Sequence, residues 1–376
     1  MGTKSITKKR FVYLDFIKVL SIYFVCCYHY NNLPKNFLTE PSISTYFNYL
    51  FTGILSTGVP LFFMVNGALM LNKGYYLKKH IKKIINIILL TVIWGIITLL
   101  VLAIINNKHY TYVAFNYSLW SWENGSINHL WFLQALVCVY LLFPLIKEAY
   151  DKEDKTIFKY ITIVVFILTF GNVFLNIIAN IIRGVFGINI IEATLGITNI
   201  TGNGFNFFNN FNVFRGFYAY TIVYFIIGGI ILNRINNKVT IKTTHISILF
   251  IVGMVSLFAY GIMISRINGA IYDNIWNGYD TVMTLGISIA IFCFAYEFRN
   301  KLEKISNTIE VIGSNTIGIY FIHRIVGTLI KPIYVQLPYS YSLAPNLIFG
   351  FVVMSLSLVI ALIIKKIPLG KYLFSI

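Results

Sequence analysis

Charged residues are scarce in this chain. They make up 11% of its 376 residues, whereas soluble domains usually carry about 25%. Hydrophobic residues make up 57%, and the mean hydropathy is +0.75. Apolar stretches recur from the first residues to the last and leave no room for a sizeable soluble domain. The composition therefore indicates an integral membrane protein.

Several catalytic and binding signatures are also missing. The four cysteines, Cys26, Cys27, Cys138 and Cys293, lie in apolar stretches with neither metal-ligand spacing nor a disulfide pattern, so we expect small buried apolar side chains. No Gly-x-Ser-x-Gly motif points to a serine acyl-enzyme. The absence of an internal repeat leaves an inverted-repeat transporter without direct support.

Long apolar stretches dominate what is present. About 20 helical residues cross the roughly 30 Å of hydrocarbon in a bilayer, and the lack of alternation argues against barrel strands. We therefore expect an all-α integral membrane protein, a bundle of about ten transmembrane helices that forms one domain over residues 1–376. The predicted spans are approximately 11–31, 47–71, 84–106, 129–147, 157–182, 214–233, 245–266, 276–297, 311–331 and 344–365.

The net charge of +17 is distributed unevenly between alternate connections. The connections on the side of Lys4, Lys8, Lys9 and Arg10 hold 22 lysines and arginines. The opposite connections hold six, namely Lys35, Lys108, Arg183, Arg215, Arg266 and Lys331. The positive-inside rule then places both termini in the cytoplasm, and the basicity reflects topology, with no nucleic-acid partner expected.

The first predicted span contains ionisable residues that are costly in lipid. Asp15, Lys18 and His29 follow one helical stripe, since eleven residues make about three turns and separate Lys18 from His29 by about 16 Å. Each ionisable group costs about 2.5 to 3.5 kcal/mol at the bilayer centre. The stripe therefore predicts a path through the membrane, with a cation for a phosphorylated donor and an imidazole for proton transfer. A snorkelling lysine and an interfacial histidine are the alternative.

Two further histidines are expected at the depth of His29. His129 and Trp131 begin the fourth span, and His323 and Arg324 lie in the outer part of the ninth. The three histidines could meet, but they lack the carboxylate or cysteine spacing of a metal site, and no metal is expected. The remaining histidines, His80, His109 and His245, receive no role.

A run of lysines surrounds the second connection, at residues 71–85. The positive-inside rule alone explains this run. Attraction of the phosphates of a cytosolic donor to Lys78, Lys79, Lys82 and Lys83 explains it as well. Two longer outer segments, 106–127 and 184–210, are rich in aromatic residues or in Gly, Asn and Phe. They are expected to fold back over the outer face, as a lid or as interfacial anchors.

Five stretches in this order resemble the integral-membrane acyltransferase family 3, which contains O-acetyltransferases of bacterial surface polysaccharides. They are YLDFIKVLSIYFVCCYH, GVPLFFMVNGALML, INHLWFLQALVCVYLLFPLI, YTIVYFIIGGIIL and IGSNTIGIYFIH. The resemblance covers about 350 residues. It implies transfer of an acyl group, usually acetyl, from cytosolic acyl-CoA to a glycan hydroxyl across a bacterial cytoplasmic membrane, with no bound cofactor.

The resemblance also implies roles for particular residues. The family's Arg and His, separated by ten residues, correspond to Lys18 and His29, and lysine cannot form the bidentate fork of arginine. Its basic pair matches Lys79 with Lys82 or Lys83.

On this basis His29 is the expected general base or transient acyl acceptor, with Asp15 orienting Lys18. Lys18, Lys79, Lys82 and Lys83 would bind the donor, and His129, Trp131, His323 and Arg324 the acceptor or the developing oxyanion.

Two other functions remain open at the level of sequence. A transporter of polysaccharide or lipid-linked sugar would also need polar residues inside a bundle, and a structural scaffold would make the stripe incidental. The sequence does not identify the acyl group, the acceptor hydroxyl or the presence of a covalent intermediate.

Overall fold

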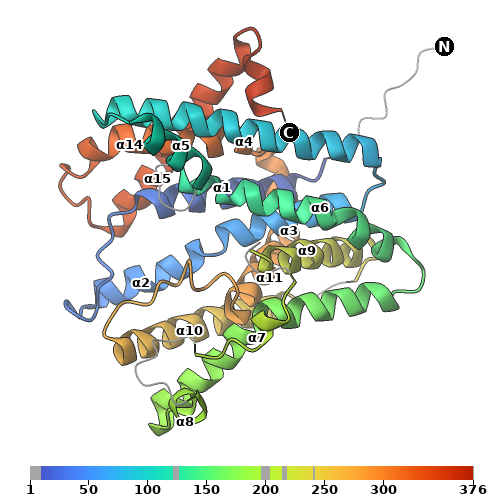
Figure 1. Ribbon diagram of the computed structural model, residues 1–376, viewed down its shortest axis with the longest axis vertical. Helices are drawn as coiled ribbons and strands as arrows, with labels where there is room; N and C mark the ends of the chain where they lie inside the picture. Colours follow the sequence, from blue (N-terminus) through green and yellow to red (C-terminus); the bar gives the residue numbers. More distant parts are fainter. Residues whose placement is uncertain (1–9, 122–126, 196–203, 214–217, 240–241, 376) are drawn as a thin grey trace.

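The computed structural model describes residues 10–121, 127–195, 204–213, 218–239 and 242–375, and the chain folds into helices throughout these ranges (Figure 1). No strand occurs in them. Some residues named in the sequence analysis lie outside the described ranges. They are the cations Lys4, Lys8, Lys9 and Arg215 of the charge pattern and parts of both long outer segments. The α-helices are α1 (Val12–Tyr30), α2 (Ile43–Leu55), α3 (Gly58–Leu71), α4 (Leu77–Ile105), α5 (Tyr112–Ser121), α6 (Trp131–Asp151), α7 (Thr156–Phe186), α8 (Ile190–Leu195), α9 (Tyr220–Asn236), α10 (Thr243–Asn268), α11 (Val282–Glu297), α12 (Arg299–Leu302), α13 (Ser306–Ser314), α14 (Thr316–Tyr334) and α15 (Leu343–Lys366). Short 3-10 helices cover Asn128–Leu130, Phe208–Asn210, Glu303–Ile305 and Gly370–Phe374.

Seven helical segments among the described residues are long and apolar enough to cross a membrane. They are Val12–Tyr30, Ile43–Leu71, Leu77–Ile105, Asn128–Asp151, Thr156–Phe186, Thr243–Asn268 and Leu343–Lys366. In lipid every backbone polar group needs an internal partner, which a helix supplies. The predicted all-α membrane protein is confirmed.

Not all of the ten predicted spans are helices long and apolar enough to cross a membrane. Helix α9 is apolar but short, and α14 carries His323, Arg324 and Lys331, which lower its hydropathy. Helix α11 joins the helical segment Arg299–Ser314 at a bend of 62°, and the pair would make an eighth span. The number ten and the cytoplasmic position of the termini therefore stay predictions.

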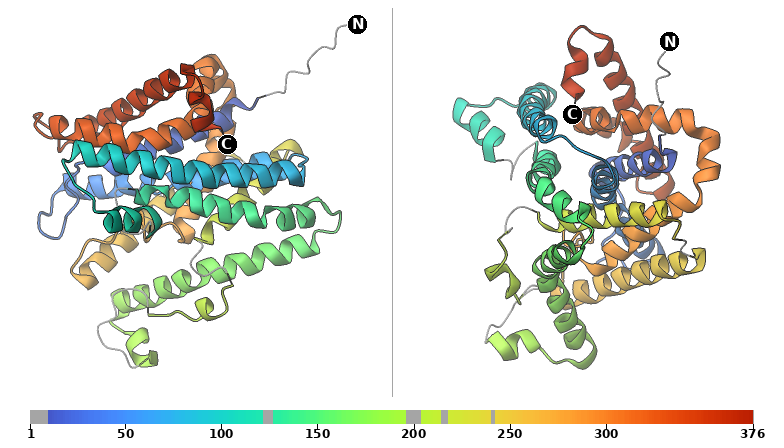
Figure 2. Two further views of the ribbon diagram at one scale, coloured as in Figure 1. Left: turned by 45° about the horizontal axis from the view of Figure 1, so that its top comes forward. Right: turned by 90° about the vertical axis from the view of Figure 1, so that its right-hand side faces the viewer.

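Helix α1 lies in the middle of the bundle, where it can carry a buried site. It packs against α3 on one side and against α13, α14 and α15 on the other. Figures 1 and 2 show α1, α4, α6 and α7 running in a similar direction, with α4 and α15 toward one side of the molecule and α7 and α10 toward the other. The stripe of Asp15, Lys18 and His29 consequently faces protein on several sides.

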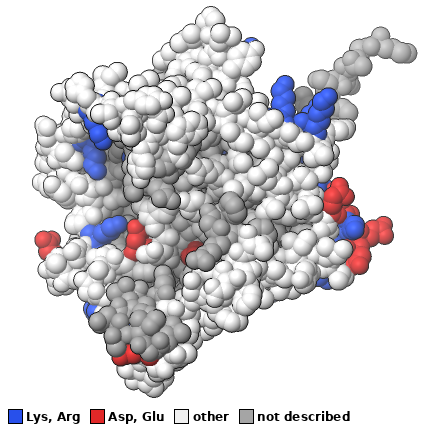
Figure 3. Space-filling view, viewed as in Figure 1, with Lys and Arg blue, Asp and Glu red and all other residues white. Residues whose placement is uncertain are grey.

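The outer helices present apolar side chains to their surroundings. On α4, exposed apolar residues recur at intervals of three, four or seven, with one adjacent pair, and so cover one face of the helix; they are Ile81, Ile85, Ile88, Leu89, Ile93, Leu100 and Ile104. On the face drawn in Figure 3, Lys, Arg, Asp and Glu gather toward the two ends of the helices and leave a largely uncharged band between them. This arrangement suits a helical bundle whose outer surface faces lipid.

Candidate functional site

A cluster of charged side chains surrounds Asp15 in the first turn of α1. Asp15 is 3% exposed and accepts hydrogen bonds from Arg10 Nε and, at 2.7 Å, from Lys18 Nζ. The hydrogen bond with Asp15 raises the pKa of Arg10 above its ordinary value, so the guanidinium stays charged. Two cations thus face the carboxylate of Asp15, and the negative charge of Glu310 on α13 also acts on Arg10.

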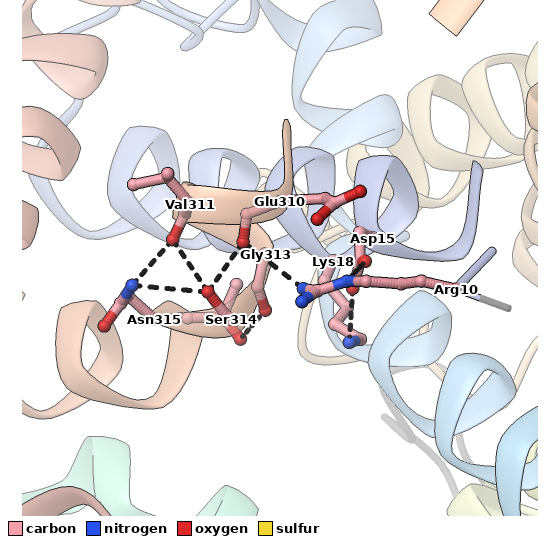
Figure 4. A network of polar contacts seen from close by, with 9 residues as sticks. Arg10, Asp15, Lys18, Glu310, Val311, Gly313, Ser314 and Asn315 are labelled. Carbon is pink, nitrogen blue, oxygen red and sulfur yellow. Dashed lines mark hydrogen bonds and ion pairs between the residues drawn. The ribbon is translucent and has the colours of Figure 1, made fainter. Parts of the chain in front are cut away.

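Helix α13 closes one side of this charged cluster (Figure 4). Arg10 Nη2 donates to the carbonyl oxygen of Glu310 at 3.3 Å. A Cβ atom at Gly313 would lie 2.8 Å from the Cβ of Asp15, so the two helices meet here only because residue 313 has no side chain. The end of α13 fixes the direction in which Arg10 extends.

A cavity of about 270 Å³ opens beside the cluster. We call it the basic cavity, and it is lined by Arg10, Phe11, Leu14, Asp15, Lys18, Leu69 and Lys73. Three of its residues are cationic and one is anionic. Such a lining attracts anions, and arginine presents a planar fork that matches phosphate oxygens.

A second cavity of about 210 Å³ lies deeper in the bundle. This central cavity is lined by Lys18, Phe62, Val65, Asn66, Leu69, Lys83, Phe132, Leu136, Tyr140, Thr316, Ile317 and Tyr320. Within it Lys83 Nζ donates to the Tyr140 hydroxyl at 3.2 Å, and that hydroxyl donates to Asn66 Oδ1 at 2.9 Å. The network holds the ammonium group of Lys83 against the cavity wall.

The predicted donor-binding lysines separate into two groups. Lys18 and Lys83 line the central cavity, whereas Lys79 and Lys82 are exposed on the outer face of α4. The Lys79 ammonium lies 5.2 Å from the centre of the Tyr76 ring. The helical period explains the split, because His80, Ile84 and Ile87 define the buried face and position 83 lies next to it.

The three predicted histidines come together at the far end of α1. The ring centres of His29 and His323 are 5.3 Å apart, and those of His129 and His323 are 5.5 Å apart. A small cavity of about 20 Å³ adjoins His29 and His129, and His323 lies behind its lining. This histidine cavity is lined by Val25, Tyr28, His29, Leu55, Val59, His129, Trp131, Phe132, Trp276, Tyr279 and Tyr320.

Hydrogen bonding fixes the protonation of one of these rings. His323 Nδ1 lies 2.5 Å from the carbonyl oxygen of Tyr320, and a carbonyl only accepts, so Nδ1 carries a proton. Among the described residues, His323 Nε2 and both ring nitrogens of His129 are buried without a hydrogen-bond partner. Buried polar atoms are normally satisfied, so these nitrogens are suited to receiving a ligand.

The other two predicted acceptor residues occupy different places. Trp131 lines the histidine cavity and its ring centre lies 5.3 Å from that of Trp276. Arg324 extends beside Tyr30, with its guanidinium 5.9 Å from the Tyr30 ring centre, and its charge acts on His29, His129 and His323. The carbonyl of Arg324 accepts a hydrogen bond from the Tyr30 hydroxyl at 2.7 Å. Arg324 is not among the residues that line the histidine cavity.

The three cavities follow one another along α1. Lys18 and Leu69 line both the basic and the central cavity. Phe132 and Tyr320 line both the central and the histidine cavity. The bundle thus contains a series of spaces that leads from the charged cluster to the histidines, as the stripe of Asp15, Lys18 and His29 predicts.

Several cavity residues were not predicted. Arg10 precedes the first predicted span and contributes to the predictions only through the uneven charge of the two membrane sides. Tyr320 lies three residues before His323 and Phe132 three after His129, so helical spacing from the histidines was a usable signal. Asn66 is a lone polar side chain in an apolar run, which is also a signal.

The histidine cluster does not form a metal centre within the described ranges. No group of three or more His, Cys, Asp or Glu side chains there is arranged to hold a metal ion. The chemistry available at this end of the cavities is that of imidazole, indole and phenol groups.

The fold and site define a multi-pass membrane protein with a basic cavity, a central cavity and a buried histidine cluster in series. The family model described as Acyltransferase domain matches residues 11–366. The chain therefore belongs to acyltransferase family 3 and is a membrane acyltransferase. No curated protein and no solved structure matches it.

Proposed function

We propose that this acyltransferase moves an acyl group from cytosolic acyl-CoA to a hydroxyl of a cell-surface or lipid-linked glycan across the bacterial cytoplasmic membrane. The observation that carries the proposal is the series of cavities between the charged cluster and the histidines. A donor bound at one end would present its thioester to an acceptor at the other. No bound cofactor is required.

The basic cavity suits the phosphates of CoA. Arg10, Lys18 and Lys73 surround it with a single carboxylate, that of Asp15. The guanidinium of Arg10 supplies the planar donor that a lysine at position 18 lacks. The pantetheine arm would then extend through the central cavity, past the Lys83 ammonium. Lys79 and Lys82 would attract the donor only from the outer face of α4.

The histidine cavity suits the transfer step. A neutral His29 would accept the proton of the acceptor hydroxyl as its oxygen attacks the thioester carbonyl, a role worth about 10² to 10⁴ in rate. As the carbon–sulfur bond breaks, the imidazolium returns this proton to the CoA thiolate. An N–H of His129 would stabilise the oxyanion, and His323 would position the other two rings. Trp131 would contact the acceptor.

The test is acyl transfer by the purified full-length protein in lipid nanodiscs. Radiolabelled acetyl-CoA is supplied with a lipid-linked glycan extract from the producing cells, and released CoA and label in the glycan are measured. Wild-type protein is expected to release CoA and label the glycan, and His29→Ala to lose about 100-fold or more in rate.

A matched variant controls for loss of a histidine as such. His245 is exposed at the start of α10, and His245→Ala should retain wild-type rates. Equal rates in His29→Ala and wild type would remove His29 from catalysis. Movement of the glycan across the bilayer without any CoA release would favour a transporter and contradict the proposed function.

A further inference from the structure

We infer that Phe132 and Tyr320 select the acyl group by its length and admit a short, two-carbon group to the histidines. This inference rests on the proposed function and adds to it the residues that determine donor specificity. It concerns the boundary between the central and the histidine cavity.

Both side chains stand at that boundary. They are the two residues shared by the linings of the two cavities. Their ring centres are 5.4 Å apart, and the residues are 7% and 5% exposed, respectively. An acyl group on its way to His29 must therefore pass beside these two rings.

The two rings are held in place by their neighbours. The Tyr320 hydroxyl donates to the carbonyl oxygen of His129. The Phe132 ring lies 5.6 Å from the centre of Phe62 and 5.1 Å from that of Phe63. Close-packed aromatic side chains move only when their neighbours move. The wall that these two rings contribute to the histidine cavity is therefore rigid, and the space behind it does not expand to take a longer acyl chain.

The space beyond the boundary is small. The histidine cavity measures about 20 Å³ against about 210 Å³ for the central cavity. A single water needs about 10 to 15 Å³ on the same scale, so the tip of an acetyl group fits. A four-carbon chain carries two more methylenes, and these would need the space that Phe132 fills.

Removal of the Phe132 ring should therefore relax the selection. The experiment compares kcat/KM for acetyl-CoA and butyryl-CoA in purified wild type and Phe132→Ala, with CoA release as the readout. Wild type is expected to favour acetyl-CoA. The ratio of butyryl to acetyl kcat/KM should rise about tenfold or more in Phe132→Ala, since one methylene in a hydrophobic pocket changes discrimination by about 10- to 200-fold.

Ile317→Ala is the matched control. Ile317 is an apolar side chain that lines only the central cavity and is not among the rings packed against Phe132, so its removal should leave the ratio within about threefold of wild type, well below the effect of a methylene at the boundary. If Phe132→Ala does not elute as a folded protein, Phe132→Leu provides the smaller side chain.

Each outcome has one meaning. An unchanged ratio in a folded Phe132→Ala or Phe132→Leu overturns the inference and leaves the proposed function standing. An equal rise in Ile317→Ala also overturns it, because the effect would then belong to the whole central cavity. Failure of wild type to release CoA from either donor contradicts the proposed function, and the inference with it.

Discussion

Asp15 is the residue on which the charged cluster depends. Its carboxylate is buried and accepts from both Arg10 and Lys18. Removal of one partner of a buried ion pair leaves an uncompensated charge, which is costly. Here the two cations share one anion, so the loss of Arg10 still leaves Asp15 paired with Lys18. Arg10 can consequently be tested for donor binding without exposing an unpaired buried carboxylate.

Arg10→Ala should weaken donor binding with little effect on chemistry. We expect the KM for acetyl-CoA to rise about tenfold, the amount for a hydrogen bond to a charged group, and kcat to stay within about twofold because Arg10 is remote from the histidines. Steady-state kinetics at low ionic strength measures both constants.

Two further variants serve as controls for Arg10→Ala. Arg10→Lys keeps the charge and should recover part of the affinity. Lys159→Ala removes a cation on the exposed side of α7 and should change neither constant. A fall in kcat with an unchanged KM in Arg10→Ala would assign Arg10 to catalysis or to folding and not to phosphate binding.

The histidines show what residue-level reasoning can and cannot predict. Their common depth follows from helical rise and span boundaries, and the structure brings all three together. The sequence also predicted Arg324 at this depth; its guanidinium lies beside Tyr30 and outside the lining of the histidine cavity, although its charge acts on all three histidines. Depth depends on residue number alone, whereas direction depends on which neighbours surround each helix.

At the scale of elements, the crossing of α3 and α9 shapes the wall of the central cavity. A Cβ atom at Gly67 would lie 1.7 Å from the Phe225 carbonyl oxygen, and one at Gly228 would lie 1.9 Å from that of Met64. Small residues allow membrane helices to approach this closely. Because Asn66 and Val65 on α3 line the central cavity, this crossing also sets the position of part of the site.

Gly67→Ala should separate α3 from α9 and destabilise the bundle. Overpacking a core costs about 1 to 3 kcal/mol, and we expect the upper end of this range or more because the obstacle is backbone. Thermal unfolding of the detergent-solubilised protein measures the change.

Gly74→Ala is the control for the crossing. A Cβ atom at Gly74 has no neighbour within 4 Å, so its melting temperature should match wild type. Equal melting temperatures for Gly67→Ala and wild type would contradict the close crossing.

The elements themselves were largely predictable. Apolar runs predicted the positions of α1, α6, α7, α10 and α15 to within about four residues, whereas α4 begins seven residues before its predicted span because its first turns carry lysines. The interruptions were harder: Ile43–Leu71 is one span, as expected, but the Ser56 and Thr57 hydroxyls bond to carbonyls of α2 at 2.6 and 2.7 Å where α2 gives way to α3 within it. The bend of 62° after α11 was also hard to predict, because no proline or repeated glycine marks it in the sequence. Such breaks depend on tertiary contacts more than on local composition.

For the whole molecule, the distribution of cations defines a direction. Lys82 lies near the start of α4 and Lys108 just beyond its end, about 40 Å apart along a helix at 1.5 Å per residue. Both are exposed. If the lysine-rich side is cytoplasmic, these two positions lie on opposite sides of the membrane.

Cysteine labelling in a Cys138→Ser background tests this orientation, because Cys26, Cys27 and Cys293 are buried. Lys82→Cys should react with an impermeant maleimide in inverted membrane vesicles and not in intact cells, and Lys108→Cys should show the reverse. Reaction of Lys82→Cys in intact cells would place the basic cavity on the outside and remove its access to cytosolic acyl-CoA.

The boundary formed by Phe132 and Tyr320 has a further consequence for the membrane that contains it. A passage through a membrane protein risks leaking protons and other ions down their gradients. Because the Phe132 and Tyr320 rings leave little room between the central and the histidine cavity, an acyl chain that passes beside them would displace water from this passage, so acyl transfer need not open a path for ions.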